Sequence, residues 1–243
     1  MSAVYKNILS AIDSGKKLLA VLIDPDKFAV ESLPDFMAKV NDSLATHIFV
    51  GGSTVEDEET DILVEAIKRC SNLPVVLFPG DVTQITEKAD ALLFLSLISG
   101  RDPEYLIGKH VESVSKLRSL DLEVIPTGYL LIENGKETAV QRVTETKPMP
   151  RADIQNIVDT AKAGELLGMK LIYLEAGSGA IHSIAPDIIS SVKTDLNIPL
   201  IVGGGIRTKE QLQLAYNAGA DMVVIGTAFE QDEAFFNELK SDN

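Results

Sequence analysis

Short runs of branched apolar residues recur along the chain, and most are followed by a segment with helical periodicity. A parallel strand that is buried on both faces has this continuous apolar character. The predicted strands lie at residues 17–23, 47–51, 75–78, 91–97, 123–127, 171–175, 200–202 and 222–225. Apolar residues at helical spacing separate many of them, most clearly at residues 56–70, 103–119, 152–167, 186–195 and 209–218.

This alternation of strands and helices indicates an α/β protein with a parallel sheet. Eight such strands in 243 residues match a (β/α)8 TIM barrel, which typically has about 250 residues. Only residues 79–90 separate the third strand from the fourth, so we expect the third helix to be short or missing. No linker or low-complexity tract interrupts the pattern, and we treat residues 1–243 as a single domain.

The last two predicted strands both end in glycine. Residues 198–206 read IPLIVGGGI, and residues 222–227 read MVVIGT. The loops after the seventh and eighth strands of such barrels commonly bind phosphate, because glycine lets backbone N–H groups approach an anion closely. The alternative is that these glycines only form tight turns. The candidate phosphate-binding residues are Gly204, Gly205, Gly226 and Thr227.

The sixth predicted strand ends in a glutamate followed by a glycine-rich loop. Glu175 should face the mouth of the barrel, with Tyr173 two residues earlier on the same side. There Glu175 could accept hydrogen bonds from substrate hydroxyls or take a proton, whereas the alternative is a structural ion pair. The candidate binding residues of this segment are Tyr173, Leu174, Glu175, Ala176, Gly177, Ser178 and Gly179.

Asp24 is the first polar residue after the first strand. A carboxylate in this place suits Mg2+, which commonly binds one or two carboxylates together with water and substrate phosphates. The alternative is a turn, since Asp and Pro start turns readily. Ser53, after the second strand, could offer its hydroxyl to the same metal or cap the helix that follows.

Several weaker candidates follow other strands. Thr127, Gly128 and Tyr129 lie at the predicted end of the fifth strand and could line a pocket. Positive charges near the fourth and seventh strands could meet a second phosphate group, or could be ordinary surface charges. These are Arg101, Lys109, His110 and Arg207.

Composition narrows the classes of partner. The net charge of −14 argues against nucleic acid and against broad docking on anionic lipid, because no basic stripe is available. Cys70 is the only cysteine, which excludes an intramolecular disulfide and fits a cytoplasmic protein. The N-terminus lacks a signal-peptide pattern, and the longest apolar run is far shorter than a membrane span.

Taken in order, five motifs resemble the geranylgeranylglyceryl phosphate synthase family, whose relatives include bacterial heptaprenylglyceryl phosphate synthases. The motifs are DPDK at 24–27, GGST at 51–54, YLEAGSG at 173–179, GGGI at 203–206 and GT at 226–227. The family has a modified barrel that lacks a regular third helix. The resemblance implies a prenyltransferase that joins sn-glycerol 1-phosphate to a polyprenyl diphosphate, forming an ether-lipid precursor and releasing diphosphate.

The resemblance also implies roles for individual residues. It places Mg2+ on Asp24 and Ser53, and glycerol phosphate on residues 173–179, Gly204-Gly205 and Gly226-Thr227. The expected donor is geranylgeranyl diphosphate, with a longer heptaprenyl donor as the alternative. A homo-oligomer, either a dimer or a hexamer, is expected on the same basis.

Two other functions remain open. A phosphosugar isomerase or synthase shares the paired phosphate loops, but its chemistry usually needs an acid and a base on opposing strand ends, and the fifth strand offers no Asp partner for Asp24. A non-catalytic module that binds a phosphorylated metabolite is the second alternative. The presence of both Asp24 and Glu175 argues against such a module.

Overall fold

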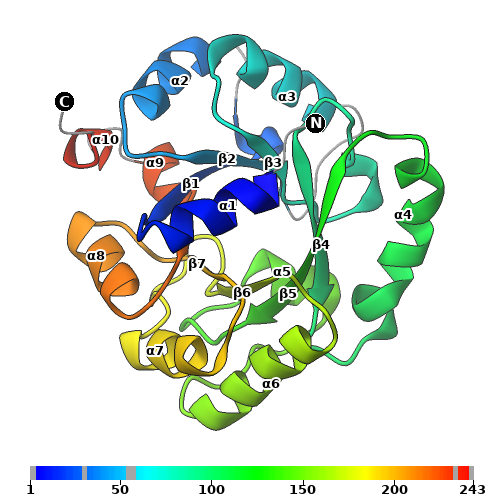
Figure 1. Ribbon diagram of the computed structural model, residues 1–243, viewed down its shortest axis with the longest axis vertical. Helices are drawn as coiled ribbons and strands as arrows, with labels where there is room; N and C mark the ends of the chain where they lie inside the picture. The colour runs from blue at the N-terminus through cyan, green and yellow to red at the C-terminus, as the bar shows by residue number, and fades with distance from the viewer. Residues whose placement is uncertain (1–3, 29–31, 53–58, 232–234, 241–243) are drawn as a thin grey trace.

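The structure is a closed barrel of parallel strands (Figure 1). The computed structural model describes residues 4–28, 32–52, 59–231 and 235–240. Within these residues the strands follow one another around the barrel in sequence order, and β1 pairs with β8. The predicted (β/α)8 barrel is therefore confirmed. The strands are β1 Leu18–Ile23, β2 His47–Val50, β3 Val75–Leu77, β4 Ala91–Leu97, β5 Glu123–Leu131, β6 Leu171–Glu175, β7 Leu200–Gly203 and β8 Met222–Ile225.

Helices surround the barrel in Figure 1, and several begin with a side chain that satisfies the first turn. Thr138, Asp153 and Thr208 accept hydrogen bonds from backbone N–H groups of the helices that they precede. The described α-helices are α1 Val4–Asp13, α2 Leu33–Asn41, α3 Glu59–Cys70, α4 Lys109–Leu117, α5 Ala139–Thr144, α6 Ile154–Leu166, α7 Pro186–Asp195, α8 Lys209–Asn217, α9 Thr227–Gln231 and α10 Phe235–Glu238. Shorter turns are η1 Pro25–Lys27, η3 Val82–Gln84 and η4 Glu104–Gly108.

The connection between β3 and β4 contains only the 3-10 turn η3 in place of a regular helix. Asp81 caps this turn, because its side chain accepts a hydrogen bond from the backbone N–H of Thr83. The prediction of a short or missing third helix is confirmed. The ends of β2 and β3 therefore meet other partners, which are described below.

The fifth strand differs from its prediction. It runs to Leu131 rather than to Thr127, and Thr127 is fully buried, with its hydroxyl donating to the carbonyl of Ile125. Gly128 does not form a turn here. A Cβ on Gly128 would stand 2.9 Å from Cδ1 of both Ile98 and Ile172, so this glycine allows close packing within a continuous strand.

Side chains alternate between the inside and the outside of the barrel along each strand. Leu18 and Ala20 on β1 pack inside, whereas Leu19 and Val21 pack in the layer between the strands and the helices. On β6 the inward residue is Tyr173, and Glu175 lies two residues later on the same side. The alternation thus directs Glu175 to the mouth at the carboxyl ends of the strands.

Helix α1 lies across the opposite end of the barrel (Figure 1). Its residues Val4 and Ile8 pack into the core inside the barrel. The carboxylate of Glu123, the first residue of β5, accepts hydrogen bonds from the backbone N–H groups of Val4 and Tyr5 at 2.6 and 3.1 Å. A carboxylate at a helix N-terminus is favourable because it satisfies unpaired donors there.

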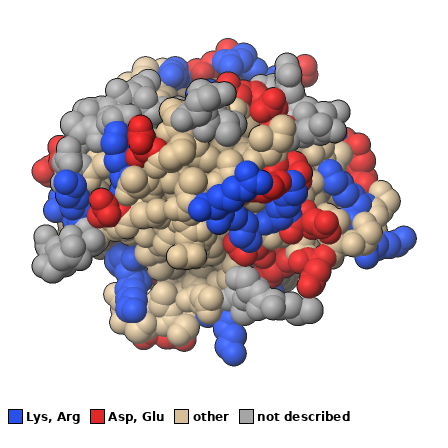
Figure 2. Space-filling view, turned by 90° about the horizontal axis from the view of Figure 1, so that it is seen from above, with Lys and Arg blue, Asp and Glu red and all other residues tan. Residues whose placement is uncertain are grey.

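The surface in Figure 2 carries acidic and basic side chains close to one another, with uncharged surface between the groups. No extended basic patch is visible on that face, which agrees with the net charge of −14. Among the helices in the described part of the chain, none has the length and apolar character that crossing a membrane requires.

Candidate active site

A cavity of about 640 Å³ opens at the carboxyl ends of the strands. Residues at or after the ends of β1, β2, β3, β5, β6, β7 and β8 line it, together with apolar residues of β4 and α5. Active sites of such barrels lie at this face, where loops from different strands converge. The cavity has a polar region beside β6, β7 and β8 and an apolar region beside β4 and α5.

The polar region contains the glycine-rich loops that the sequence predicted. Every predicted residue of the two phosphate loops lines the cavity. The loop after β6 joins them, because the hydroxyls of Ser178 and Thr227 lie 3.0 Å apart and share a hydrogen bond. The glycine cradle is defined here as Gly177, Ser178, Gly179, Gly204, Gly205, Gly226 and Thr227.

Gly204 shows why the cradle needs glycine. Its φ of +86° lies in the left-handed region, where other residues are strained. A Cβ at this position would also stand 2.6 Å from the backbone nitrogen of Gly177 and 2.6 Å from Oε1 of Glu175. The loops after β6 and β7 are therefore in direct contact at Gly204.

Glu175 lies at the bottom of the polar region and is 6% exposed. Its carboxylate accepts hydrogen bonds from the backbone N–H of Gly177 and from the hydroxyl of Tyr173. Burial raises the pKa of Glu175, and these two hydrogen bonds partly offset the effect. Among the described residues no cation forms an ion pair with it. This argues against the structural ion-pair alternative and leaves a carboxylate suited to binding hydroxyls.

Not all of the predicted sixth-strand segment reaches the cavity. Tyr173, Glu175 and the glycines of the loop line it. The side chains of Leu174 and Ala176 point the other way and pack in the layer between the strands and the helices. The period of two along a strand explains the difference.

Three aromatic rings form the floor beneath Glu175. The ring centroids of Phe78 and Tyr173 lie 5.3 Å apart, those of Tyr129 and Tyr173 5.4 Å apart, and those of Phe78 and Tyr129 5.9 Å apart. Burial raises the pKa of both tyrosines, and the nearby Glu175 raises it further, so both stay neutral phenols. Of the weak candidates at the fifth strand, Tyr129 lines the cavity, whereas Thr127 is buried away from it.

Asp24 lines the cavity beside the end of β1, as the sequence predicted. Its carboxylate caps η1 by accepting from the backbone N–H of Asp26, and its Oδ2 lies 2.5 Å from Nζ of Lys27. A Cβ on Gly52 would stand only 2.4 Å from Oδ1 of Asp24, so the backbone of the loop after β2 forms a wall against this carboxylate. Ser53, the second predicted metal ligand, lies outside the described residues.

The donor set at Asp24 fits Mg2+ that shares its coordination with a phosphorylated substrate. The described residues contain no group of three His, Cys, Asp or Glu side chains placed to hold a metal. Mg2+ does not need such a group, because it is usually bound by one or two carboxylates together with water and substrate phosphates. Lys27 is the present partner of Asp24 and competes for the same carboxylate.

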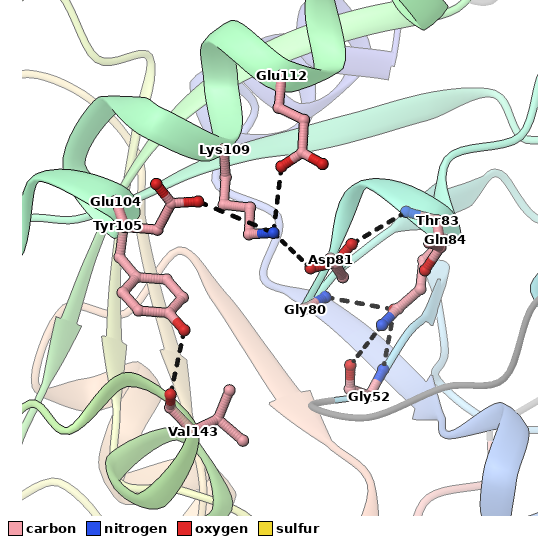
Figure 3. Close-up of polar contacts among 10 residues, drawn as sticks. All are labelled: Gly52, Gly80, Asp81, Thr83, Gln84, Glu104, Tyr105, Lys109, Glu112 and Val143. Carbon is pink, nitrogen blue, oxygen red and sulfur yellow. Dashed lines mark hydrogen bonds and ion pairs between the residues drawn. The ribbon is translucent and has the colours of Figure 1, made fainter.

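The apolar region runs from the strand ends toward η4 and α5. Its walls include Phe94, Leu95, Tyr105, Val140 and Val143. The hydroxyl of Tyr105 donates to the carbonyl of Val143 at 3.1 Å, which joins η4 to α5 (Figure 3). Helix α5, which the sequence pattern did not predict, contributes Val140 and Val143 to these walls.

His110 lines this region and is only 8% exposed. Its ring lies edge-on to Phe94, with the centroids 4.4 Å apart, and its Nδ1 has no hydrogen-bond partner among the described residues. Burial lowers the pKa of His110, so the ring is neutral near pH 7. It therefore contributes no positive charge for a second phosphate group.

The other predicted cations are mostly held by protein groups. Lys109 lines the cavity and lies 2.9 Å from Asp81 and 3.1 Å from Glu112 (Figure 3). Arg101 donates to the backbone carbonyls of Ile98 and Gly100 and lines a separate hollow. Arg207 lines the main cavity and donates to the carbonyl of Ala180 at 2.8 Å.

Comparison with known proteins gives a consistent family. The profile of the PcrB family matches residues 13–242. A geranylgeranylglyceryl phosphate synthase from Zunongwangia profunda is 56% identical over 233 residues, which cover 96% of this chain and 99% of the relative. One from Thermococcus kodakarensis is 44% identical over 217 residues, covering 89% of this chain and 85% of the relative.

Solved structures agree with these sequence relatives. The crystal structure of (S)-3-O-geranylgeranylglyceryl phosphate synthase from Thermoplasma acidophilum, in complex with its substrate sn-glycerol-1-phosphate, superposes with a TM-score of 0.92. It is 34% identical, and the match covers 98% of this chain and 96% of that one. A tryptophan synthase α-subunit from Pyrococcus furiosus, with a TM-score of 0.59 and 16% identity, shares the barrel fold alone.

Proposed function

The chain belongs to the PcrB family, and from this membership we propose that it is a prenyltransferase that joins sn-glycerol 1-phosphate to a polyprenyl diphosphate. The names of its relatives support geranylgeranyl diphosphate as the donor. The observation that carries the proposal is that one cavity holds the glycine cradle, a buried carboxylate and an apolar region. A cytoplasmic location is proposed on the composition given above.

The acceptor would bind in the polar region. Its phosphate suits the glycine cradle, because glycine lets backbone N–H groups approach an anion closely. Its hydroxyls would then lie toward Glu175, whose carboxylate is an acceptor beside the cradle at Gly204. The relative from T. acidophilum was solved with the same acceptor bound, which supports this assignment. The phosphate end of the acceptor would thus contact the glycine cradle, and its hydroxyl end would contact Glu175. These two contacts together would favour the enantiomer that turns its reacting hydroxyl toward the prenyl donor.

The donor would place its tail in the apolar region and its diphosphate near Asp24. The walls formed by β4, η4 and α5 match a hydrocarbon chain, since burial of apolar surface is favourable. Asp24 follows β1, which pairs with β8, so it lies at the side of the glycine cradle formed by Gly226 and Thr227 and could hold Mg2+, with Ser53 as the second proposed ligand. When bound, the metal would neutralise charge on the diphosphate leaving group.

The chemical step is a substitution at the allylic carbon of the donor. The 3-hydroxyl oxygen of glycerol 1-phosphate forms a bond to this carbon, and the bond from the carbon to the diphosphate oxygen breaks. The hydroxyl proton passes to Glu175, and diphosphate leaves with the bonding electrons. Glu175 can take this role because burial raises its pKa, which makes it a stronger base than an exposed glutamate. Positioning of the hydroxyl in line with the carbon supplies the remaining catalysis.

The deciding experiment incubates the purified chain with glycerol 1-phosphate and labelled farnesyl, geranylgeranyl or heptaprenyl diphosphate, with Mg2+ or with a chelator. We expect an ether product and free diphosphate, with the highest kcat/KM for the geranylgeranyl donor and none with the chelator. A preference for the heptaprenyl donor would change the assigned chain length only. If no donor were incorporated in the presence of Mg2+, the proposed function would be wrong.

A further inference from the structure

Gln84 joins the loops after β2 and β3 through a single carboxamide. The side chain is 2% exposed and lies at the end of η3, the turn that occupies the place of the third helix. Its Nε2 donates to the carbonyl of Gly52 at 2.9 Å. Its Oε1 accepts from the backbone N–H groups of Gly52 and Gly80 at 3.4 and 3.3 Å (Figure 3).

The connection between β3 and β4 contains η3 in place of a regular helix, and this explains why the contacts of Gln84 are needed. Backbone groups at strand ends must find partners when they are removed from water. A carboxamide offers both a donor and an acceptor. Gly52 needs both, because its backbone N–H must donate a hydrogen bond and its backbone carbonyl must accept one. Gln84 therefore supplies hydrogen bonds to the backbone groups of Gly52 and Gly80.

The loop after β2 bears directly on Asp24. Gly52 stands so close to the Asp24 carboxylate that a Cβ would overlap Oδ1, at 2.4 Å. The neighbouring Gly51 is equally close to β3, since a Cβ there would overlap the carbonyl oxygen of Phe78. A shift of Gly52 would therefore move the wall against which the Asp24 carboxylate rests.

The other side of η3 is also fixed. Asp81, which caps the turn, lies 2.9 Å from Nζ of Lys109 on α4 (Figure 3). Lys109 is held in turn by Glu112 at 3.1 Å. The turn is thus anchored to α4 at its start through Asp81. At its end, the hydrogen bonds of Gln84 hold Gly52 in a defined position relative to the turn.

We propose that Gln84 is a positioning residue for the diphosphate of the prenyl donor, acting through Gly52 on the carboxylate of Asp24. This inference rests on the proposed function and adds a residue that does not itself touch substrate. Gln84 leaves the acceptor site untouched, because the glycine cradle belongs to β6, β7 and β8 on another part of the mouth.

The first test is Gln84→Met, which keeps the length of the side chain and removes all three hydrogen bonds. We expect the apparent KM for prenyl diphosphate and the half-saturating Mg2+ concentration to rise, and kcat/KM to fall by up to about 10²-fold. The affinity for glycerol 1-phosphate, measured by calorimetry, should not change. Thr83→Val, at the exposed neighbouring position, is the matched control.

A second readout does not depend on turnover. Hydrogen exchange of the backbone N–H groups of Gly52 and Gly80 should be faster in Gln84→Met than in the wild type, while exchange in the loop after β7 stays the same. Unchanged exchange at Gly52 and Gly80 in a folded variant would overturn the proposal, because the carboxamide would then not hold the loop.

Gln84→Glu gives a reversible version of the test. A neutral carboxyl can donate its O–H to the carbonyl of Gly52, whereas an ionised one repels that carbonyl. The ratio of variant to wild-type kcat/KM should therefore rise as pH falls, since burial raises the pKa of a carboxyl group at this position. A ratio that is low and independent of pH would indicate a structural role only and would overturn the proposal.

The outcomes separate this inference from the proposed function. Inactivity of the wild-type chain with every donor would contradict the proposed function itself. Activity of the wild type together with unchanged donor and Mg2+ constants in Gln84→Met would contradict only the role of Gln84.

Discussion

Gly204 and Glu175 lie in contact, so that a methyl group on Gly204 would stand 2.6 Å from Oε1 of the carboxylate. The proposed phosphate site and the proposed hydroxyl-binding group are therefore neighbours across the ends of β6 and β7. One small acceptor molecule could bind to both. Substitution of either residue should therefore alter the use of the same substrate. We expect a change at Gly204 to alter mainly KM and a change at Glu175 to alter mainly kcat.

Gly204→Ala should weaken the binding of glycerol 1-phosphate. The new methyl group would press on the backbone nitrogen of Gly177, and the left-handed φ would add roughly 1–2 kcal/mol of strain. We expect KM for glycerol 1-phosphate to rise about tenfold, as loss of about 1.4 kcal/mol implies. Gly168→Ala is the control, because Gly168 has a φ of +95° with nothing within 4 Å of its Cβ position. Equal effects of both substitutions would assign the loss to strain alone.

Asp24→Asn should remove most activity while glycerol 1-phosphate still binds. The amide keeps the shape of the side chain but loses the charge that Mg2+ needs. A loss of roughly 10²–10³-fold in kcat/KM is expected, since a metal supplies several kcal/mol of charge stabilisation. Asp35→Asn, at an exposed position on α2, controls for the change in net charge. Full activity of Asp24→Asn with normal Mg2+ dependence would show that another residue binds the metal.

Glu175→Gln should lower kcat far more than it changes the affinity for glycerol 1-phosphate. Removal of a general base typically costs about 10²–10⁴-fold. The same variant should discriminate less between the 1- and 3-phosphate enantiomers, because the hydroxyls lose their charged acceptor. Steady-state kinetics with each enantiomer measures both effects. Normal turnover with retained rejection of the 3-phosphate would exclude the assigned role.

The pH dependence of kcat/KM should show an acid limb above the ordinary glutamate pKa of 4.5. Burial raises the pKa of Glu175, and the base works only when it is ionised, so activity is lost as pH falls through this raised value. The limb that belongs to Glu175 should be missing in Glu175→Gln. An identical limb in that variant would assign it to another group.

The protein should form a homo-oligomer, as the family resemblance implies. Exposed apolar residues on the outer side of η4 and α4 are the first surface to test: Ile107 is 58% exposed and Val111 is 66% exposed. Light scattering at micromolar concentration should give the mass of a dimer or a hexamer, and Val111→Glu should lower it if this surface is buried between subunits. A monomer in the wild type would contradict the prediction.

The sequence predicted the barrel well because its strands are continuous apolar runs, several of which end at or just before a glycine or an acidic residue. It placed Asp24, Glu175 and the glycine cradle at the mouth for the same reason, since polar residues directly after buried strands must lie at that edge. The prediction was wrong at the end of β5. The local pattern indicates Gly128 as the point where the chain leaves the sheet, but the strand continues to Leu131. The contact of that glycine with Ile98 and Ile172 depends on packing from distant segments, which a local pattern does not contain.

Other parts of the site depend on contacts of the same distant kind. Gln84 has no sufficient local signal, because its partner Gly52 lies 32 residues earlier in the chain, in another loop. Helix α5 is short, at residues 139–144, and its apolar positions are too few to establish a period. The apolar walls that it contributes were therefore missing from the sequence-based site.

Helix α1 has a consequence for the path of the molecules that react here. It covers the amino end of the barrel, and inward side chains such as Leu18, Ala20 and Phe49 fill the interior, so the cavity has its opening at the carboxyl ends of the strands. If the acceptor binds in the polar region as proposed, beside the buried Glu175, a long hydrocarbon donor that arrived first would obstruct its way in. The proposed function would then require ordered entry, with glycerol 1-phosphate before the donor. Diphosphate and the lipid product would then leave through the same opening, in the reverse direction.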